Sequence, residues 1–286
     1  MPSSKENIFS VDVEDWFHIL ELDSAPSFSS WHTLENRVKK NFYTLLDFFD
    51  KKEAKVTCFF LGWIAEQSPE MVVEAKERGH EIASHGYAHQ LIYTQNRQEF
   101  SEDIIKTKCI LENITGEAVN GYRAPGFSLT KSTLWVFEEL AKAGYKYDSS
   151  IFPGTRGHGG ICNESFIPHK INTQYGKITE LPITLVRIIG KNICFFGGGY
   201  FRVFPYSVIR YMAKRVNIEN RPVIYYIHPR DIDPGQPRLP MNWIRRFKSY
   251  INLKSTMPKL EKLLDEQKVT SIQNWLDKNF DGQQER

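Results

Sequence analysis

The sequence predicts an α/β fold in which parallel strands are joined by helices, and it favours a barrel. Strand-like and helix-like segments alternate from Ile8 to His228, which is the pattern of parallel strands with helical crossovers. Polar side chains able to do chemistry also follow the predicted strands, as they do at the mouth of a parallel barrel. An open, doubly wound sheet fits less well, because no G-x-G-x-x-G or Walker pattern follows the first strand.

Seven segments have the short, apolar character of buried strands: Ile8–Val13, Lys55–Leu61, Glu81–Ser84, Gly121–Arg123, Tyr145–Asp148, Lys177–Leu181 and Pro222–His228. Four segments between them carry apolar residues at helical spacing: Trp31–Lys52, Pro69–Arg78, Asn96–Asn113 and Ser132–Ala143. Gly116 and Gly144 are placed to end the last two helices. The triple glycine Gly197–Gly199 lacks the context of a phosphate-binding loop, so we expect a tight loop there.

The rest of the chain is predicted to pack around this core. Phe152–Lys177 is rich in Gly, Pro, Asn and His without a clear period, which predicts a long excursion over the barrel mouth. Two amphipathic segments, Met257–Lys268 and Ser271–Phe280, are expected to be packing helices. We expect one domain over residues 1–286, with a core at about 8–232 and a C-terminal helical extension at about 238–282.

Composition limits the classes of partner and location. The net charge of +3 is too small to indicate nucleic acid or an anionic membrane. The N-terminus lacks the pattern of a secretory signal, and no apolar run approaches the ~20 residues of a membrane span, so we expect a cytoplasmic protein. The cysteines are widely spaced without a C-x-x-C pair, which favours reduced, mostly buried thiols: Cys58, Cys109, Cys162 and Cys194.

Two histidines four residues apart, His85 and His89, directly follow a predicted strand. Side chains at i and i+4 project from one face of a helical turn, so both imidazoles can reach one metal ion. A pair with this spacing is more often an ordinary surface or core pair. Its place at a strand end, with acidic residues elsewhere, favours a metal site.

Three carboxylates, Asp12, Glu14 and Asp15, follow the first predicted strand. Crowded buried carboxylates repel one another unless a cation or protons compensate, so they indicate a bound ion or an arginine partner. The alternative is a helix cap with a solvated face.

Three further polar residues, Arg123, Asp148 and His228, end predicted strands. Their ordinary interpretations are a plain turn, a cap of the Ser149–Ser150 turn and a hydrogen-bonded core histidine, respectively.

Four motifs in order resemble those of polysaccharide deacetylases of the nodulation-protein-B homology class, carbohydrate esterase family four: Val11-Asp12-Val13-Glu14-Asp15, Ser84-His85-x-x-x-His89, Arg123-Ala124-Pro125-Gly126-Phe127 and Ile227-His228. Three more resemble the subgroup associated with bacterial exopolysaccharide gene clusters: Tyr147-Asp148-Ser149-Ser150, Phe196-Gly197-Gly198-Gly199-Tyr200-Phe201-Arg202 and Tyr226-Ile227-His228-Pro229-Arg230. The resemblance spans roughly residues 8 to 232 and implies a distorted (β/α) barrel with seven strands.

The resemblance implies a metal-dependent hydrolase that removes N-acetyl groups from amino sugars of a polysaccharide or its precursor. Zn²⁺, or another divalent transition metal such as Co²⁺, would be held by His85, His89 and one N-terminal carboxylate, lowering the pKa of bound water towards ~7. Asp12 would be the general base and His228 the general acid. Arg123 would orient Asp12 and keep it ionised.

Supporting roles extend to further residues. Asp148 would raise the pKa of His228 so that it is protonated near pH 7. Five aromatic residues beside the motifs are candidates for stacking on pyranose faces, although such side chains are individually more often core: Trp16, Tyr87, Tyr122, Phe127 and Tyr200.

The chain departs from the usual family pattern at its first motif. Most relatives have two adjacent aspartates, base then ligand, whereas Val13 follows Asp12 here. The metal ligand must therefore be Glu14 or Asp15. Side chains at 12 and 14 share a face if the strand continues, which favours Glu14 and leaves Asp15 open.

Two other functions remain open from sequence: cleavage of a small non-sugar amide, and catalytically silent carbohydrate binding. The intact Asp12 and His228 favour an enzyme. The expected partner is an N-acetylated carbohydrate, either an exopolysaccharide or a peptidoglycan-like polymer, with no nucleic acid and no membrane span.

Overall fold

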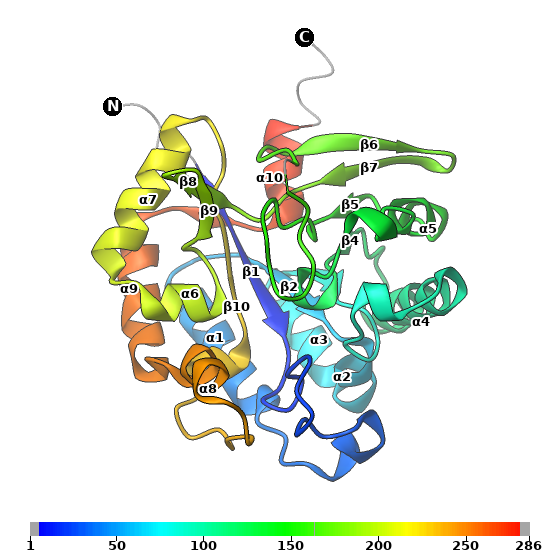
Figure 1. The fold of residues 1–286 in the computed structure, drawn as a ribbon. Coiled ribbons are helices and arrows are strands. Elements are labelled where there is room, and N and C mark those ends of the chain that lie inside the picture. The colour runs from blue at the N-terminus through cyan, green and yellow to red at the C-terminus, as the bar shows by residue number, and fades with distance from the viewer. Residues whose placement is uncertain (1–5, 163, 281–286) are drawn as a thin grey trace. The chain divides into compact units, whose positions relative to one another are not determined.

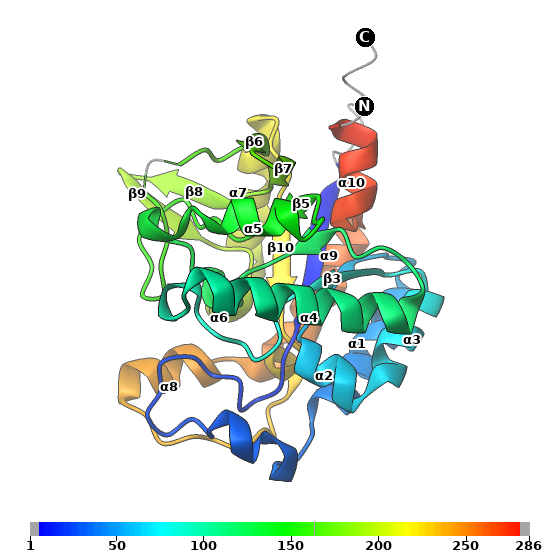
Figure 2. The same cartoon turned by 90° about the vertical axis from the view of Figure 1, so that its right-hand side faces the viewer.

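The computed structural model describes residues 6–162 and 164–280, and the chain divides into two compact units. The first unit comprises the residues up to Cys58, Glu77–Glu81 and the residues from Cys194 onward. The second unit comprises Phe59–Lys76 and Ile82–Ile193. Figures 1 and 2 label the helices and strands of both units.

The first unit is built on β1 (Asn7–Val13), whose residues are all buried. β10 (Ile224–Ile227) pairs with it in parallel, with Ile8 opposite Ile224, and the two strands lie side by side in Figure 1. β11 (Val269–Thr270) pairs in parallel with the start of β1, and β2 (Thr57–Phe60) begins in this unit as the next strand. A strand buried along its whole length needs cover on both faces, which is the usual condition of parallel sheets.

The helices of the first unit are α1 (Val38–Lys51), α6 (Gly198–Val203), α7 (Tyr206–Ile218), α8 (Trp243–Tyr250), α9 (Thr256–Glu266) and α10 (Ile272–Asn279), with the 3-10 helices η1 (Phe28–Thr33), η5 (Pro229–Ile232) and η6 (Leu253–Ser255). α10 and η5 pack against β1. The apolar stripe of α1 is buried through Phe42, Leu45 and Phe49, as its helical spacing predicts. The two C-terminal packing helices are confirmed as α9 and α10.

The second unit carries a mostly parallel sheet. β3 (Glu81–Ser84), β4 (Gly121–Tyr122), β5 (Tyr147–Asp148) and β7 (Gly176–Glu180) are parallel neighbours in that order. The remaining strands are antiparallel: β6 (His169–Thr173) pairs with β7, and β8 (Leu185–Ile188) forms a separate ribbon with β9 (Lys191–Cys194).

The helices of the second unit are α2 (Gly62–Gln67), α3 (Pro69–Glu77), α4 (Arg97–Thr115) and α5 (Val136–Lys142), with the 3-10 helices η2 (Ile92–Thr94), η3 (Pro125–Phe127) and η4 (Lys131–Thr133). α4 begins with a capping box between Asn96 and Glu99 and ends at Gly116, whose φ of 69° is the left-handed conformation predicted from its position. α4 packs against α2, and Figure 2 shows the two side by side.

The α/β class is confirmed, and each of the seven predicted strands has a counterpart in the structure. The helix predicted over Trp31–Lys52 is wrong in its first turns, because α1 begins only at Val38. The excursion predicted over Phe152–Lys177 contains β6, whose register with β7 supplies hydrogen bonds that local sequence does not reveal. The predicted tight loop at Gly197–Gly199 is instead the start of α6, with Gly198 at a φ of 48°.

The prediction of reduced, mostly buried cysteines is confirmed only in part. All four cysteines are free thiols, but only Cys58 and Cys194 are buried, while Cys109 and Cys162 are exposed.

Across residues 6–162 and 164–280, no helix combines the length and the hydropathy that crossing a bilayer requires. The predicted extents of the core and of the C-terminal extension stay predictions.

Candidate active site

The first unit brings together two carboxylates and an imidazole that are far apart in sequence. Asp12 lies on β1, Glu14 follows that strand, and His228 follows β10. His228 Nε2 lies 3.8 Å from Glu14 Oε1 and 4.0 Å from Asp12 Oδ2. One ligand atom from each residue lies within 4.8 Å of the others. Parallel pairing of β1 with β10 produces this cluster, because the carboxyl ends of both strands meet at one edge.

Asp15 has a different task from its neighbour Glu14. Its Oδ1 accepts the backbone N–H of Trp16 at 2.7 Å, and its Oδ2 accepts those of Arg37 at 2.8 Å and Val38 at 2.9 Å. These bonds fix the start of α1 at Val38, which explains why the predicted helix does not begin earlier. Burial raises the pKa of Asp15, while the backbone N–H groups of Val38, Trp16 and Arg37 oppose that shift. A metal at Asp15 would compete with all three bonds, so the geometry favours Glu14.

Asp231 holds His228 in a defined orientation. Its Oδ2 lies 2.9 Å from His228 Nδ1 and accepts the His228 backbone N–H at 3.0 Å, while its Oδ1 forms a 3.0 Å ion pair with Arg202. Nδ1 is thereby engaged, and Nε2 is the atom near Asp12 and Glu14. Burial of Asp231 would raise its pKa, but Arg202 and His228 hold that pKa well below its usual range.

The same carboxylates control the charge of His228. Burial would lower the pKa of His228, but Glu14, Asp231 and Asp12 together raise it from 6.5 to about 9. The prediction that Asp148 raises the pKa of His228 is corrected, because Glu14, Asp231 and Asp12 do so. The spacing of Asp231 three residues after His228, across Pro229, is a capping-box pattern that could have identified it.

His85 in the second unit has one nitrogen committed to the backbone. Its Nδ1 lies 2.8 Å from the carbonyl oxygen of Arg123. A carbonyl can only accept, so Nδ1 carries the hydrogen and Nε2 keeps a lone pair for a metal ion. The rings of His85 and His89 have centroids 5.4 Å apart, and both side chains are buried. The structure thus brings the two predicted histidine ligands together.

The segment from His85 to His89 is a loop, so the predicted helical turn is wrong. Gly86, with a φ of 74°, and His89, with a φ of 53°, bend the backbone. Asp103 on α4 fixes this loop: both of its carboxylate oxygens lie 3.0 Å from the backbone N of Tyr87. Burial raises the pKa of Asp103 to about 6, although the N–H groups of Tyr87 and Ala88 oppose the shift. Nothing in the helical pattern around Asp103 distinguishes it from a solvated acid.

Arg123 is fully buried and stacked. Its guanidinium lies 4.1 Å from the ring centroid of Phe59 and 5.4 Å from that of Phe127. Its Nε donates to the carbonyl of Ser149 at 3.2 Å, and its Nη2 to the hydroxyl of Ser149 at 3.1 Å. The planar donor fork is therefore held in place on several sides, which a lysine could not reproduce.

Asp148 belongs to a buried network that sequence reasoning missed in part. It accepts the hydroxyl of Ser150 at 2.6 Å and its backbone N–H at 3.1 Å, so the simple interpretation as a turn cap is correct. Asp148 also lies opposite Glu180 in the register of β5 with β7. Burial raises the pKa of both carboxyl groups, and the charge of Arg123 opposes the shift.

Three of the five predicted stacking aromatics are core residues. Trp16, Tyr122 and Phe127 are 7, 1 and 3% exposed, which leaves no ring face for a sugar. The Trp16 indole N–H donates to the Glu35 carbonyl at 3.0 Å. Burial raises the pKa of Tyr122 well above its usual value. These three assignments are corrected, because tertiary packing covers side chains that follow a motif in sequence.

The other two aromatics keep some exposure. Tyr200 is 41% exposed on α6. Tyr87 is half-buried, its hydroxyl donates to Glu66 at 2.6 Å, and Lys106 Nζ lies 3.3 Å from its ring centroid. A sugar-stacking role for either residue stays a prediction.

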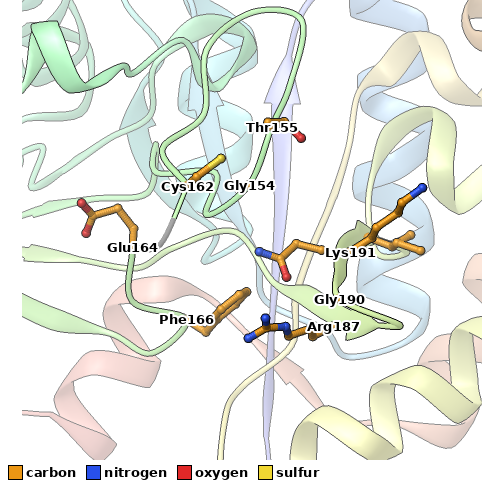
Figure 3. Close-up of a pocket in the computed structure, with 10 residues that line it drawn as sticks. Gly154, Thr155, Cys162, Glu164, Phe166, Arg187, Gly190 and Lys191 are labelled. Atoms are coloured by element: carbon orange, nitrogen blue, oxygen red, sulfur yellow. The ribbon is translucent and has the colours of Figure 1, made fainter.

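The second unit also contains a hollow of about 750 Å³, and Figure 3 draws the residues that line it. Gly154, Thr155 and Cys162 line it from one loop, and Arg187 and Lys191 line it from the β8–β9 ribbon. It contains none of the predicted site residues.

Comparison with known proteins gives two family matches. Residues 23–147 match the polysaccharide deacetylase family, and residues 149–277 match a domain of unknown function (DUF3473). A peptidoglycan deacetylase of Helicobacter pylori is 31% identical over 107 residues, which cover 37% of this chain and 36% of that protein. A peptidoglycan-N-acetylglucosamine deacetylase of Bacillus cereus is 34% identical over 96 residues, covering 33% and 35%. The chain thus spans about a third of the length of these relatives.

Solved structures resemble the chain over almost its whole length. A putative polysaccharide deacetylase from Mycobacterium smegmatis has a TM-score of 0.66 at 18% identity, covering 99% of this chain and 93% of that one. A family 4 carbohydrate esterase from Streptomyces lividans, solved with acetate, has a TM-score of 0.50 at 13% identity, covering 94% and 93%. The likeness establishes the fold, and it confirms the predicted distorted-barrel class. The exopolysaccharide-associated subgroup stays a prediction.

We predict that Asp231→Asn lowers the pKa of His228. The raised pKa means that the protonated imidazole stabilises the folded state fully below pH 6.5, and that this contribution is lost as pH rises through about 9. NMR titration of chelator-treated protein should show that the His228 imidazole loses its proton at a lower pH in the variant than in the native protein. Exposed His32 is an internal control. An unchanged titration of His228 would exclude Asp231 as its charge partner.

We predict that Asp15→Ala costs about 1 to 3 kcal/mol of unfolding free energy, because it leaves buried backbone N–H groups without an acceptor. Urea unfolding measures this loss, and the same change at exposed Asp23 should leave the midpoint within error. Loss of bound metal with full stability would instead make Asp15 a ligand.

Proposed function

The chain belongs to the polysaccharide deacetylase family through its residues 23–147, and from this premise we propose that it is a metal-dependent N-deacetylase of a polysaccharide. The observation that carries the proposal is the acid–base pair of the first unit. His228 Nε2 lies 4.0 Å from the Asp12 carboxylate, while Asp231 holds His228 Nδ1 at 2.9 Å. Amide hydrolysis needs both groups, because water must lose a proton and the departing amine must gain one.

The residues suit a divalent transition ion held by Glu14, His85 and His89. All three side chains are buried, and two imidazoles with one carboxylate are a donor set that Zn²⁺ or Co²⁺ accepts. The bond from His85 Nδ1 to the Arg123 carbonyl supports this assignment, because metal-binding histidines usually engage their second nitrogen in this way. Such an ion, when bound, supplies a Lewis acid that lowers the pKa of water.

Asp12 accepts the proton of the attacking water in this proposal. His228 gives its proton to the amine of the sugar as the amide bond breaks, and the Asp231 carboxylate at its Nδ1 favours the protonated imidazole. Asp231 keeps the His228 ring in the orientation that leaves Nε2 towards the other carboxylates. We assign Arg123 to Asp12 as its fixed counter-charge.

The proposed substrate is an N-acetylated amino sugar unit within a glycan. Relatives named as peptidoglycan deacetylases support this class. Both an exopolysaccharide and a peptidoglycan-like polymer offer such a unit, and acetate release from each polymer distinguishes them.

We predict that Asp12→Asn retains stoichiometric metal and loses about 10²- to 10⁴-fold in turnover, because the amide cannot accept a proton. Acetate release from chito-oligosaccharides measures turnover, and Asp23→Asn is the matched control at an exposed site. Unreduced turnover would mean that another group is the base. A native protein that holds metal but hydrolyses only small non-sugar amides would overturn the proposed substrate.

We predict that His85→Ala and Glu14→Ala each lose the bound ion and activity together, since each removes one of three proposed ligands. Metal content after dialysis, measured by mass spectrometry, checks this, with exposed His32→Ala as the control. Full activity in metal-free protein would contradict the mechanism.

A further inference from the structure

Helix α8 turns its apolar side to solvent. Trp243 is 79% exposed, Ile244 49% and Phe247 51%. At 3.6 residues per turn these three side chains fall within a sector of about 100°, which defines one apolar face. Surface helices of globular proteins normally bury such a face, whereas α8 buries Tyr250 and leaves these three side chains exposed.

The protein-facing side of α8 carries the half-buried Arg245 and the buried Tyr250 and is firmly attached. Arg245 is half-buried, and its guanidinium donates to the Leu20 carbonyl. Arg202 of the neighbouring α6 donates to the carbonyls of Lys248 at 3.0 Å and Ile251 at 2.7 Å. The Asn242 side chain caps the helix by accepting the Arg245 N–H at 2.9 Å. The apolar face of α8 is therefore presented on a fixed helix.

Positive charge flanks this face. Residues 234–260 contain no acidic residue and carry the cations Arg238, Arg245, Arg246, Lys248, Lys254 and Lys259. Two of them, Arg246 and Lys248, are exposed on α8 and lie on opposite edges of the apolar face by helical geometry. The loop that receives Arg245 carries two acidic residues, Glu21 and Asp23. The overall charge of +3 thus conceals a local basic segment.

We propose that α8 docks this protein on an anionic phospholipid membrane, with its apolar face in the headgroup–acyl boundary and Arg246 and Lys248 on lipid phosphates. An interfacial helix combines an apolar face containing Trp and Phe with basic residues beside it, as α8 does. Cations near the membrane surface are attracted by anionic lipid.

The charges favour a membrane over the other possible occupants. A second copy of this chain would place basic edges against basic edges in a two-fold contact, where like charges repel. A neutral N-acetylated glycan gives Arg246 and Lys248 no counter-charge, and aliphatic Ile244 offers it no flat ring. An anionic lipid surface satisfies the apolar face and its basic edges together.

Docking through α8 would act on the same unit that carries the acid–base pair. Arg202, which binds the end of α8, also forms the 3.0 Å ion pair with Asp231 that positions His228. The inference does not depend on the proposed function, because the apolar face contains none of the proposed catalytic or metal-binding residues.

The test uses the full chain and sedimented vesicles of phosphatidylcholine with about one third phosphatidylglycerol. We expect binding to these vesicles but not to pure phosphatidylcholine. Trp243→Ala/Phe247→Ala should weaken binding about tenfold or more, and Arg246→Glu/Lys248→Glu should do the same, most strongly at low salt. The matched control is Tyr211→Ala/Ile218→Ala on α7, whose side chains are 63 and 81% exposed.

Tryptophan fluorescence adds a readout of position. Brominated acyl chains should quench the native protein, and Trp243→Phe should remove most of that quenching while preserving binding. Acetate release from soluble chito-oligosaccharides should be the same in the Trp243→Ala/Phe247→Ala variant and the native protein, which separates this inference from the proposed function.

Three results would overturn the inference. The first is failure of the native protein to bind anionic vesicles. The second is a loss of binding in the α7 control as large as that in the α8 variant. The third is α8 substitutions that abolish self-association or oligosaccharide binding and leave vesicle binding intact.

Discussion

The ionised carboxylate of Asp231 is the interaction on which the chemistry of the first unit depends. It engages His228 Nδ1 at 2.9 Å and pairs with Arg202 at 3.0 Å, so its negative charge is compensated even though it is buried. Because Nδ1 is occupied, only Nε2 can exchange a proton with a substrate. The surrounding carboxylates then raise the pKa of His228 to about 9 against the opposing effect of burial, which is the condition a general acid needs at neutral pH.

In the second unit, hydrogen bonds with backbone groups orient the candidate metal ligands. The carbonyl of Arg123 fixes the proton of His85 at Nδ1, and Asp103 accepts the backbone N–H of Tyr87 in the loop between the two histidines. The side chain of Arg123 supplies positive charge near two buried carboxylates, Asp148 and Glu180. His85 and His228 are thus each oriented through Nδ1, His85 by the Arg123 carbonyl and His228 by Asp231, as is common around metal sites.

The three N-terminal carboxylates show how neighbours in sequence acquire different tasks. Asp12 and Glu14 lie near the imidazole of His228, whereas Asp15 accepts three backbone N–H groups and fixes the start of α1. One residue of displacement along the chain separates the candidate ligand from the helix cap. A carboxylate that accepts several backbone N–H groups is held by them and is a poor candidate for binding an ion as well.

The sequence by itself determined the α/β class, the seven strand positions and the residues at their ends. Local apolar runs predict buried strands, and the family motifs directly follow those runs. It also identified Asp12, Glu14, His85, His89 and His228 as the residues to examine. Only the tertiary structure decided the rest. Contacts between distant segments made Asp103 the partner of the loop between His85 and His89, and Glu180 the neighbour of Asp148. The bond from Asp231 to His228 fits a local capping-box spacing, but its role emerged only in the folded chain. Burial removed Trp16, Tyr122 and Phe127 from the surface. The choice between Glu14 and Asp15 likewise required three dimensions, because it depends on which N–H groups α1 brings to each carboxylate.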